Sequence, residues 1–309
     1  MNRIAIIDLG TNTFNLLIVE VKPDKTYQSL FHTKVSVKLG EGGINKGIIE
    51  PIPFQRGIDA INSYKEIIEK YEVEKIHAFG TSAIRDAANG KLFLDAIKQD
   101  TSIVVHSISG EREAELIYYG VRNAVQMNSE LSLIMDIGGG STEFIIANKN
   151  EIVWKYSFLL GAARLLERFN PSDPIADIQL DELTEYIKQE LKPLFQAIKK
   201  HPVTELIGAS GTFDSFADMI ACRFYSPDIL NDQTEYTFKL DDFKTIYDSI
   251  IKSTKKDRLQ MDGLIFMRID MIVISSILVH FVLSSFEIKK MRLSTYSLKE
   301  GVLHELLNN

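Results

Sequence analysis

A segment of strand-like sequence occurs twice in this chain, and the duplication restricts the fold more than any other feature. The stretches "IAIIDLGTNTFNLLIVE" (4–20) and "SLIMDIGGGSTEFIIAN" (132–148) align with an offset of 128 residues, which places Asp8 on Asp136. Each copy contains an apolar strand, an Asp, a turn rich in glycine and hydroxyl groups, and a second apolar strand, so each predicts a β-hairpin. Two copies of one unit predict two related domains.

The segments that follow each hairpin alternate between strand and helix patterns. After the first hairpin we predict strands over 27–38, 75–80 and 102–107 and helices over 53–71, 83–99 and 111–126. After the second we predict strands over 151–158, 205–208 and 290–293 and helices over 162–169, 180–199, 212–222, 241–252, 264–284 and 297–307. This order predicts an α/β fold with two mixed sheets and a cleft between two domains. We expect the domains to cover 1–127 and 128–309, with the helix over 297–307 a candidate to pack back on the first.

Composition and charge exclude several classes of function. The formal net charge of −7 argues against binding of duplex nucleic acid, which needs a broad basic face, but it does not exclude an anionic substrate in one cleft. The single cysteine, Cys222, excludes an internal disulfide. The longest apolar run, 271–283, contains His280 and is too short to span a bilayer, so it predicts a buried helix. We expect a cytoplasmic protein without membrane contact.

The two hairpin turns are candidate phosphate-binding loops. Successive glycines let a backbone adopt positive φ and present its N–H groups to an anion, and neighbouring hydroxyls add donors. A third loop, "IGASGTFDS" (207–215), follows a short strand and opens a helix, which is a natural anion site. The alternative interpretations are a tight hairpin turn and an ordinary helix cap. The candidate phosphate-binding residues are Thr11, Asn12, Thr13, Gly138, Gly139, Gly140, Ser141, Thr142, Gly208, Ser210, Gly211 and Thr212.

An Asp ends the first strand of each hairpin. Two merely structural turns would not both need a carboxylate at this point, whereas a clamp for a chain of phosphates would use it to hold a cation. Asp8 and Asp136 are therefore predicted direct or water-mediated partners of Mg²⁺.

Glu113 is the candidate general base. It lies at the inner edge of the apolar stripe of the helix predicted from residue 111, whereas Glu111 and Glu115 fall on other faces. An inward carboxylate in a partly dry cleft has a raised pKa and can take a proton from a water that attacks phosphorus. The alternative is a structural Glu paired with a nearby arginine. Glu143, in the second strand after the glycine turn, is a candidate to assist with metal or water.

Several cations are candidates to face a phosphate. Arg85 follows the strand over 75–80 on its loop side, and an arginine fork suits a terminal phosphoryl group. A surface ion pair with Asp86 or Asp95 is the alternative, and the sequence does not decide between them. Positive charge on the second domain's side of the cleft is available from Lys255, Lys256, Arg258, Arg268 and Arg292, each of which is singly more typical of a solvated surface residue.

Assembled, these motifs closely resemble the exopolyphosphatase / guanosine pentaphosphate phosphohydrolase family, a branch of the actin, Hsp70 and sugar-kinase superfamily. The segments that carry the resemblance are "IAIIDLGTNTFNLLI", "VKLGEGG", "FGTSAIRDAANG", "ISGEREAELIYYGV", "IMDIGGGSTEFII", "LGAARLLERF" and "IGASGTFDSFA". They run from residue 4 to about 217, with weaker similarity beyond.

The resemblance implies two ribonuclease-H-like domains around a cleft and Mg²⁺-dependent release of the terminal phosphate from polyphosphate. It implies that Glu113 is the catalytic Glu, Asp136 the metal-binding Asp, Glu143 the second acidic residue and Arg85 the phosphate-facing arginine. The chain departs from the family at Met267, where an acidic residue is usual before Arg268. It is expected to be a short member without the C-terminal HD-type domains of the long members.

Four functions are compatible with these residues. The leading hypothesis is an exopolyphosphatase, and the nearest alternative is a hydrolase of guanosine pentaphosphate. A small-metabolite kinase would need an acceptor site, and a non-catalytic polyphosphate or alarmone sensor would not need Glu113, Asp136 and Glu143 together. A homodimer is a candidate assembly.

Overall fold

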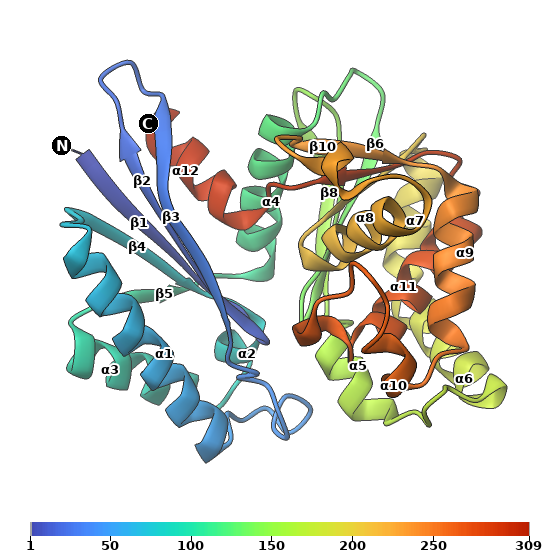
Figure 1. Ribbon diagram of the computed structural model, residues 1–309, viewed down its shortest axis with the longest axis horizontal. Coiled ribbons are helices and arrows are strands. Elements are labelled where there is room, and N and C mark those ends of the chain that lie inside the picture. Colours follow the sequence, from blue (N-terminus) through green and yellow to red (C-terminus); the bar gives the residue numbers. More distant parts are fainter. Residues whose placement is uncertain (1, 309) are drawn as a thin grey trace.

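The first domain is built on a five-stranded mixed sheet (Figure 1). The computed structural model describes residues 2–308. The sheet order is β3-β2-β1-β4-β5, with antiparallel β1–β2 and β2–β3 pairs and parallel β1–β4 and β4–β5 pairs. The strands are β1 (Asn2–Leu9), β2 (Thr13–Val21), β3 (Tyr27–Ser36), β4 (Lys75–Gly80) and β5 (Val105–Ser107). The helices are α1 (Pro51–Lys70), α2 (Ser82–Arg85), α3 (Gly90–Thr101) and α4 (Gly110–Ala124).

The second domain repeats this strand order and adds one strand. Its sheet has the order β10-β11-β9-β6-β7-β8, in which β6 pairs antiparallel with β7 and parallel with β9, as β1 does with β2 and β4. The strands are β6 (Ser132–Ile137), β7 (Thr142–Ala147), β8 (Ile152–Phe158), β9 (Leu206–Ala209), β10 (Glu235–Phe238) and β11 (Met291–Ser294). The helices are α5 (Ala162–Phe169), α6 (Asp177–Glu190), α7 (Lys192–Lys200), α8 (Gly211–Phe224), α9 (Leu240–Ile251), α10 (Lys255–Arg258), α11 (Ile272–Ser285) and α12 (Leu298–Asn308). The predicted hairpins and the α/β fold with two mixed sheets are confirmed.

The central strand β1 is apolar on both faces because helices cover both. Ala5 and Ile7 pack in the cluster that contains α1 and α3, whereas Ile4 and Ile6 pack with α4 and α12. The cluster around α4 and α12 also includes residues of β6, β7 and β9. The two helices therefore lie between the sheets, and α12 brings the C-terminal end of the chain back to the first domain (Figure 1).

Three predicted helices are broken in the structure. The helix predicted over 180–199 is divided into α6 and α7 around Leu191, because Pro193 has no N–H to continue the hydrogen-bond ladder. The helix over 83–99 becomes α2 and α3, and the helix over 264–284 becomes a 3₁₀ turn at Phe266–Arg268 and α11. Two short elements, β10 and α10, were not predicted, since four residues carry too little periodicity to identify them.

The apolar run predicted to be a buried helix is α11, whose residues from Ile272 to Val279 are all buried. Within residues 2–308 we find no helix with both the length and the apolar character needed to cross a membrane.

Candidate active site

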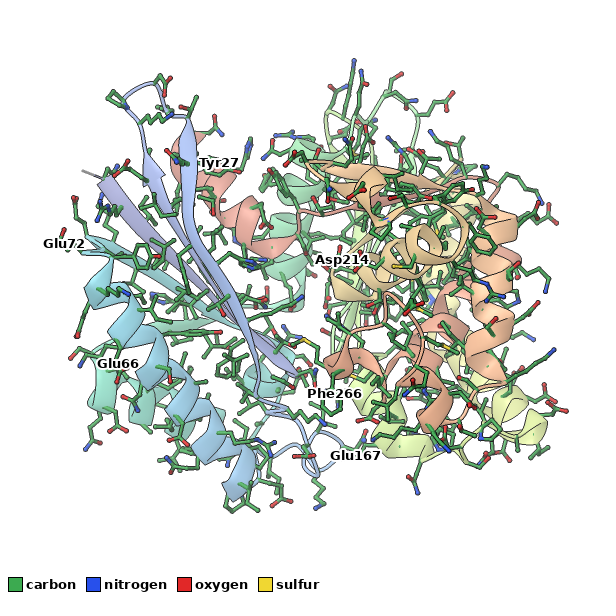
Figure 2. All side chains as sticks on the ribbon, in the orientation of Figure 1. Tyr27, Glu66, Glu72, Glu167, Asp214 and Phe266 are labelled. Atoms are coloured by element: carbon green, nitrogen blue, oxygen red, sulfur yellow. The ribbon has the colours of Figure 1, made fainter. Side chains whose placement is uncertain are left out.

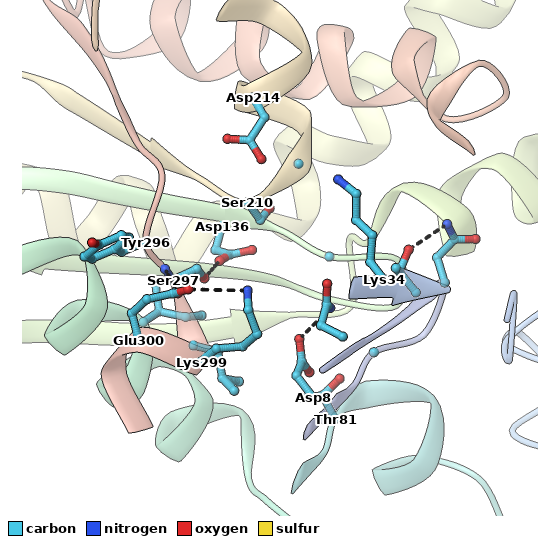
Figure 3. A pocket seen from close by; sticks show the side chains of 18 of the residues that line it. Asp8, Lys34, Thr81, Asp136, Ser210, Asp214, Tyr296, Ser297, Lys299 and Glu300 are labelled. Atoms are coloured by element: carbon cyan, nitrogen blue, oxygen red, sulfur yellow. Dashed lines mark hydrogen bonds and ion pairs between the residues drawn. The ribbon is translucent and has the colours of Figure 1, made fainter. Parts of the chain in front are cut away.

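A cavity of about 450 Å³ lies between the two domains, and both hairpin turns open into it (Figure 3). The loop between β9 and α8 and the chain around the start of α12 complete its wall. It is lined by most of the residues predicted to form the site: Asp8, Thr11, Asn12, Thr13, Glu113, Asp136, Gly138, Gly139, Gly140, Ser141, Ser210 and Gly211. Residues far apart in the sequence are thus gathered around one space.

The two turns have the same hydrogen bond at the same place in the repeat. The Gly10 amide donates to the carbonyl of Thr13 at 3.1 Å, and the Gly138 amide donates to the carbonyl of Ser141 at 3.0 Å. A Cβ added to Gly10 or Gly138 would lie 2.8 or 3.0 Å from that same carbonyl oxygen. Glycine is required at both positions because the turn closes tightly over this point.

The prediction of positive φ at the three glycines is wrong. Positive φ occurs at Gly42, Gly47 and Gly263 among the described glycines, and not at Gly138–Gly140. The glycine turn instead needs room, because a Cβ on Gly140 would lie 2.5 Å from Ser82 Oγ and 2.6 Å from Thr11 Oγ1, both in the first domain. The missing side chains allow turns from the two domains to meet.

This contact predicts the effect of Gly140→Ala. Over-packing at a close contact costs about 1–3 kcal/mol, so we expect the free energy of unfolding to fall by that amount in chemical denaturation. Because the added methyl group would press on Ser82, the double variant Gly140→Ala/Ser82→Gly should recover part of the loss, with Ser82→Gly alone as control. Equal stability of Gly140→Ala and wild type would show that the turns need not touch.

Asp8 and Asp136 end the equivalent strands β1 and β6 and face the cavity. Asn15 Nδ2 donates to Asp8 Oδ2 at 3.1 Å, and Ser297 Oγ donates to Asp136. Burial raises the pKa of Asp8 to about 6, and it also raises the pKa of Asp136.

This pair suits a Mg²⁺ ion. The raised pKa values mean that nearby protein cations do not fully offset the desolvation of these carboxylates, and a divalent cation would do so. Mg²⁺ is typically bound by one or two carboxylates together with substrate phosphates and water. Residues 2–308 contain no group of three or more His, Cys, Asp or Glu side chains placed to hold a metal ion by themselves.

Asn15 was not identified from the sequence, although the repeat contained the signal. Its equivalent at the offset of 128 is Glu143, and the structure pairs Asp8 with Asn15 and Asp136 with Glu143 in the two hairpins. The two copies have therefore diverged at one position, to an amide in the first domain and a carboxylate in the second.

Glu113 is buried at the start of α4 and lines the cavity. Arg85 Nη1 donates to Glu113 Oε2 at 2.9 Å, so the ion pair that we considered as the structural alternative is present. Burial, followed by the nearby charge of Glu143, nevertheless raises the pKa of Glu113 well above its ordinary value, against the opposing effect of Arg85. Glu113 is thus both oriented by an arginine and kept more basic than an exposed carboxylate.

Two further predicted catalytic residues lie outside the wall of the cavity. Glu143 is buried in β7, and Ser157 Oγ donates to its Oε1 at 2.6 Å. Burial raises the pKa of Glu143 to about 7. Arg85 contacts Glu113 and Asp86 rather than lining the cavity, so in this structure it faces carboxylates and not open space.

Three predicted phosphate-binding residues are also absent from the wall. Thr142 Oγ1 donates to the carbonyl of Leu160 at 2.9 Å, and Thr212 Oγ1 donates to Ser275 Oγ at 3.3 Å, so both hydroxyls are turned into the core. Gly208 lies under the ring of Phe213, where a side chain would collide with it. Their positions beside the turns suggested phosphate binding. The alternation of side chains along β7 instead turns Thr142 away from the cavity, and the first turn of α8 turns Thr212 away from it.

The cations proposed for the second domain separate into two groups. Arg292 is buried in ion pairs with Glu205 and Glu235, so its interpretation as a cleft cation is wrong. Arg258 pairs with Asp173, and Arg258 and Lys255 line a second cavity whose wall comes from both domains. Arg268 lines the cavity. Its Nε is the only buried side-chain nitrogen or oxygen in residues 2–308 without a hydrogen-bond partner.

Other cavity residues were not identified from the sequence. They include Lys34 on β3, Asp214 on α8, and Ser297 and Lys299 at the start of α12. Figure 2 shows Asp214 on the side of the second domain that faces the first. Ser297 and Lys299 reach the cavity because α12 packs back on the first domain, a packing considered above for the helix over 297–307, but the local sequence does not show that these two residues line the site.

The comparisons with known proteins agree with this architecture. The model of the Ppx/GppA phosphatase family matches residues 17–309. The crystal structure of an exopolyphosphatase from Cytophaga hutchinsonii is similar with a TM-score of 0.95 and 42% identity, covering 99% of this chain and 98% of that one. Exopolyphosphatase 1 of Mycobacterium tuberculosis is 25% identical over 308 residues, 99% of this chain and 89% of its own length.

A third relative is a larger protein. The bifunctional 3-dehydroquinate synthase/phosphatase of Fusobacterium nucleatum is 33% identical over 218 residues, which are 67% of this chain and 32% of that protein. The matched part thus spans about a third of the larger relative. With two mixed sheets of the same strand order and a family match over nearly its whole length, this chain belongs to the Ppx/GppA phosphatase family.

Proposed function

We propose that this protein is a Mg²⁺-dependent exopolyphosphatase that releases the terminal phosphate of inorganic polyphosphate. The observation that carries the proposal is Glu113, a buried carboxylate of raised pKa in the wall of a cavity that two donor-rich turns also line. The names of the relatives from Cytophaga hutchinsonii and Mycobacterium tuberculosis support polyphosphate as the substrate.

In the proposed reaction a water molecule attacks the terminal phosphorus. Glu113 accepts a proton from this water as the new P–O bond forms, and the bond from phosphorus to the bridging oxygen breaks. The electron pair of that bond leaves with the shortened chain. Arg85 holds the Glu113 carboxylate at 2.9 Å and so fixes its orientation.

The hairpin turns hold the substrate in this reaction. Backbone N–H groups of the glycine turn and hydroxyls such as Thr11 and Ser141 are donors for the oxygens of the terminal phosphate. Mg²⁺ bound by Asp8 and Asp136 would neutralise part of the negative charge on the phosphate oxygens. The chain's own contribution is to orient the phosphate and to place a base beside it.

A substrate panel tests this function. Wild-type protein with Mg²⁺ should release phosphate from long-chain polyphosphate with a higher kcat/KM than from guanosine pentaphosphate or ATP. A higher kcat/KM for guanosine pentaphosphate would replace the proposed substrate with the nucleotide. Tight binding of polyphosphate without phosphate release would favour a sensor and contradict the proposal.

The pKa of Glu113 predicts the pH dependence of the reaction. A base must be deprotonated, so kcat/KM should fall as the pH is lowered through the raised pKa of Glu113. The charges that influence this carboxylate are those of Glu143 and Asp8, which raise its pKa, and Arg85, which lowers it. In Arg85→Gln the acid limb of the pH–kcat/KM profile should therefore move to higher pH.

The control for this shift is Arg122→Gln, which removes a charge from the last turn of the same helix. The control should leave the acid limb unchanged. If the acid limb of the Arg85→Gln profile stayed at the wild-type pH, a group other than Glu113 would govern the pH dependence of kcat/KM.

A further inference from the structure

Arg164, near the start of α5, joins three segments beside the cavity. Its side chain is only 12% exposed. Nε donates to the carbonyl of Gly140 at 2.7 Å, and Nη1 donates to the carbonyl of Ile44 in the first domain at 2.9 Å. Nη2 donates to Asp86 Oδ2 at 3.3 Å and to Ser82 Oγ at 3.4 Å, both also in the first domain. One guanidinium thus holds the glycine turn of its own domain against the other domain.

All three glycine carbonyls of the turn accept hydrogen bonds from α5. The backbone amides of residues 162–164 donate to the carbonyls of Gly138 and Gly139 at 2.9–3.0 Å. The carbonyl of Gly140 has its donor in the Arg164 side chain. Any residue at position 164 would keep the first two carbonyls in place, whereas the third depends on the arginine.

These contacts set the direction of the N–H groups of the turn. The carbonyl of one residue and the N–H of the next belong to one planar trans peptide and point in opposite directions. The N–H groups of Gly139, Gly140 and Ser141 therefore point away from α5, and within residues 2–308 they donate to no protein acceptor. All three residues line the cavity. Loss of the Arg164 side chain would free the peptide that carries the Ser141 N–H.

Arg164 is also connected to Glu113 through two ion pairs. Asp86 accepts from Arg164 through Oδ2 and from Arg85 Nε through Oδ1, at 3.3 Å in both cases. Arg85 Nη1 in turn donates to Glu113 Oε2. Asp86 is thus shared between the arginine that holds the glycine turn and the arginine that orients Glu113. Arg164 lines neither of the two cavities, so it acts through these neighbours.

We propose that Arg164 is a positioning residue for phosphate release. It aligns the Ser141 N–H with the substrate phosphate and, through Asp86 and Arg85, it aligns the carboxylate of Glu113. The inference rests on the proposed function, because Glu113 must act as the base. A guanidinium suits this role because its planar fork donates in several directions at once, whereas an ammonium group is a single point of charge.

Arg164→Gln tests both effects. A misplacement of about 1 Å in an active site can cost about 100-fold in rate, so kcat should fall by roughly 10–100-fold. Without the Arg164 charge, Arg85 is the remaining ion-pair partner of Asp86 in the described residues, and Asp86 draws it away from Glu113. Because the charge of Arg85 lowers the pKa of Glu113, the acid limb of the pH–kcat/KM profile should move to higher pH.

The double variant Arg164→Gln/Asp86→Asn separates positioning from a structural link between the domains. It removes the competing carboxylate, so the acid limb should return toward its wild-type pH, while kcat should stay low because the Ser141 peptide is still free. The charges of Glu143 and Asp8, which also act on Glu113, are present in both variants. Chemical denaturation of each variant gives the free energy of unfolding, which a structural link would change by itself.

The matched control is Arg168→Gln, one turn further along α5. Arg168 is exposed, and its guanidinium lies 4.4 Å from the centre of the Tyr186 ring. The control should retain the wild-type kcat and acid limb. Wild-type kcat and acid limb in Arg164→Gln, with or without a loss of stability, would overturn the proposal. A shifted limb that Asp86→Asn does not bring back would overturn the connection through Asp86.

Binding distinguishes a failure of this inference from a failure of the proposed function. The Glu113→Gln protein is expected not to cleave its ligand, so calorimetry with Mg²⁺ gives its Kd for tripolyphosphate with and without Arg164→Gln. Misalignment of one N–H that bonds a charged phosphate should weaken binding by about 10-fold. An equal Kd would overturn the alignment of the turn. A weaker Kd, together with a wild-type protein that cleaves no polyphosphate, would retain the alignment and reject the proposed reaction.

Discussion

Glu113→Gln should reduce kcat for phosphate release from polyphosphate by roughly 10²–10⁴-fold, the usual contribution of a general base. The amide keeps the size of the side chain and can still accept a hydrogen bond from Arg85 Nη1, but it cannot take a proton from water. The measurement is steady-state phosphate release in the presence of Mg²⁺. Because the substitution leaves both hairpin turns in place, KM should change much less than kcat.

Glu111→Gln is the matched control for this experiment. Glu111 lies in the same first turn of α4 but is exposed, whereas Glu113 is buried. The control should retain activity within about 2-fold, since removing one exposed carboxylate near a helix N-terminus costs only a few tenths of a kcal/mol. Wild-type activity in Glu113→Gln would remove this residue from the role of base.

Asp136→Asn should remove activity while leaving the fold at least as stable. Burial raises the pKa of Asp136, which means that its ionised form costs free energy in the folded protein without a cation. A neutral amide avoids that cost and can still accept a hydrogen bond from Ser297. We expect kcat/KM to fall by about 100-fold or more, because the proposed Mg²⁺ ligand is lost.

Thermal unfolding supplies the second readout for this variant. Mg²⁺ that binds the native state stabilises it by mass action, so the wild-type Tm should rise as Mg²⁺ is added. Asp136→Asn should show little of this rise, and its Tm without Mg²⁺ should equal or exceed that of wild type. The surface variant Asp241→Asn should respond to Mg²⁺ as wild type does; the same Mg²⁺ response in Asp136→Asn would exclude Asp136 as a ligand.

The side-chain placements that agree with the structure are those that local pattern determines. The repeat placed Asp8 and Asp136 at equivalent strand ends, and helical periodicity turned Glu113 inward. Both inferences use the fixed geometry of one element, in which side chains three or four residues apart share a face of a helix and neighbours on a strand alternate. Such patterns can be read without knowing how the elements pack.

The parts missed depend on packing between distant segments. Ser297 was missed, and it reaches Asp136 because α12 packs back on the first domain. Arg268 was among the candidate cleft cations, and it lines the cavity because Gly211, on another element, leaves room for it. Arg292 was placed wrongly for the same reason, since the Glu205 that buries it lies 87 positions away in the sequence. Nothing local distinguishes these residues from solvated ones.

The glycine turn illustrates a different limit. Its composition predicted backbone flexibility for binding an anion, and the structure shows that Gly140 also serves the approach of Thr11 and Ser82 from the other domain. A glycine in a sequence shows that a side chain is absent, but it does not show which neighbouring residue occupies the space that the side chain would fill. Contact between the turns is therefore a property of the assembled pair of domains.

The position of α12 has a consequence for dividing the protein into fragments. Leu298, Val302 and Leu303 of this helix pack with Ile4 and Ile6 of the first sheet, although they belong to the last part of the chain. If the gene were cut at the boundary after residue 127, the second fragment would carry a helix that packs against β1 and α4 of the first. Two co-expressed halves could therefore associate through α12, and recovery of phosphate release would show that they had done so.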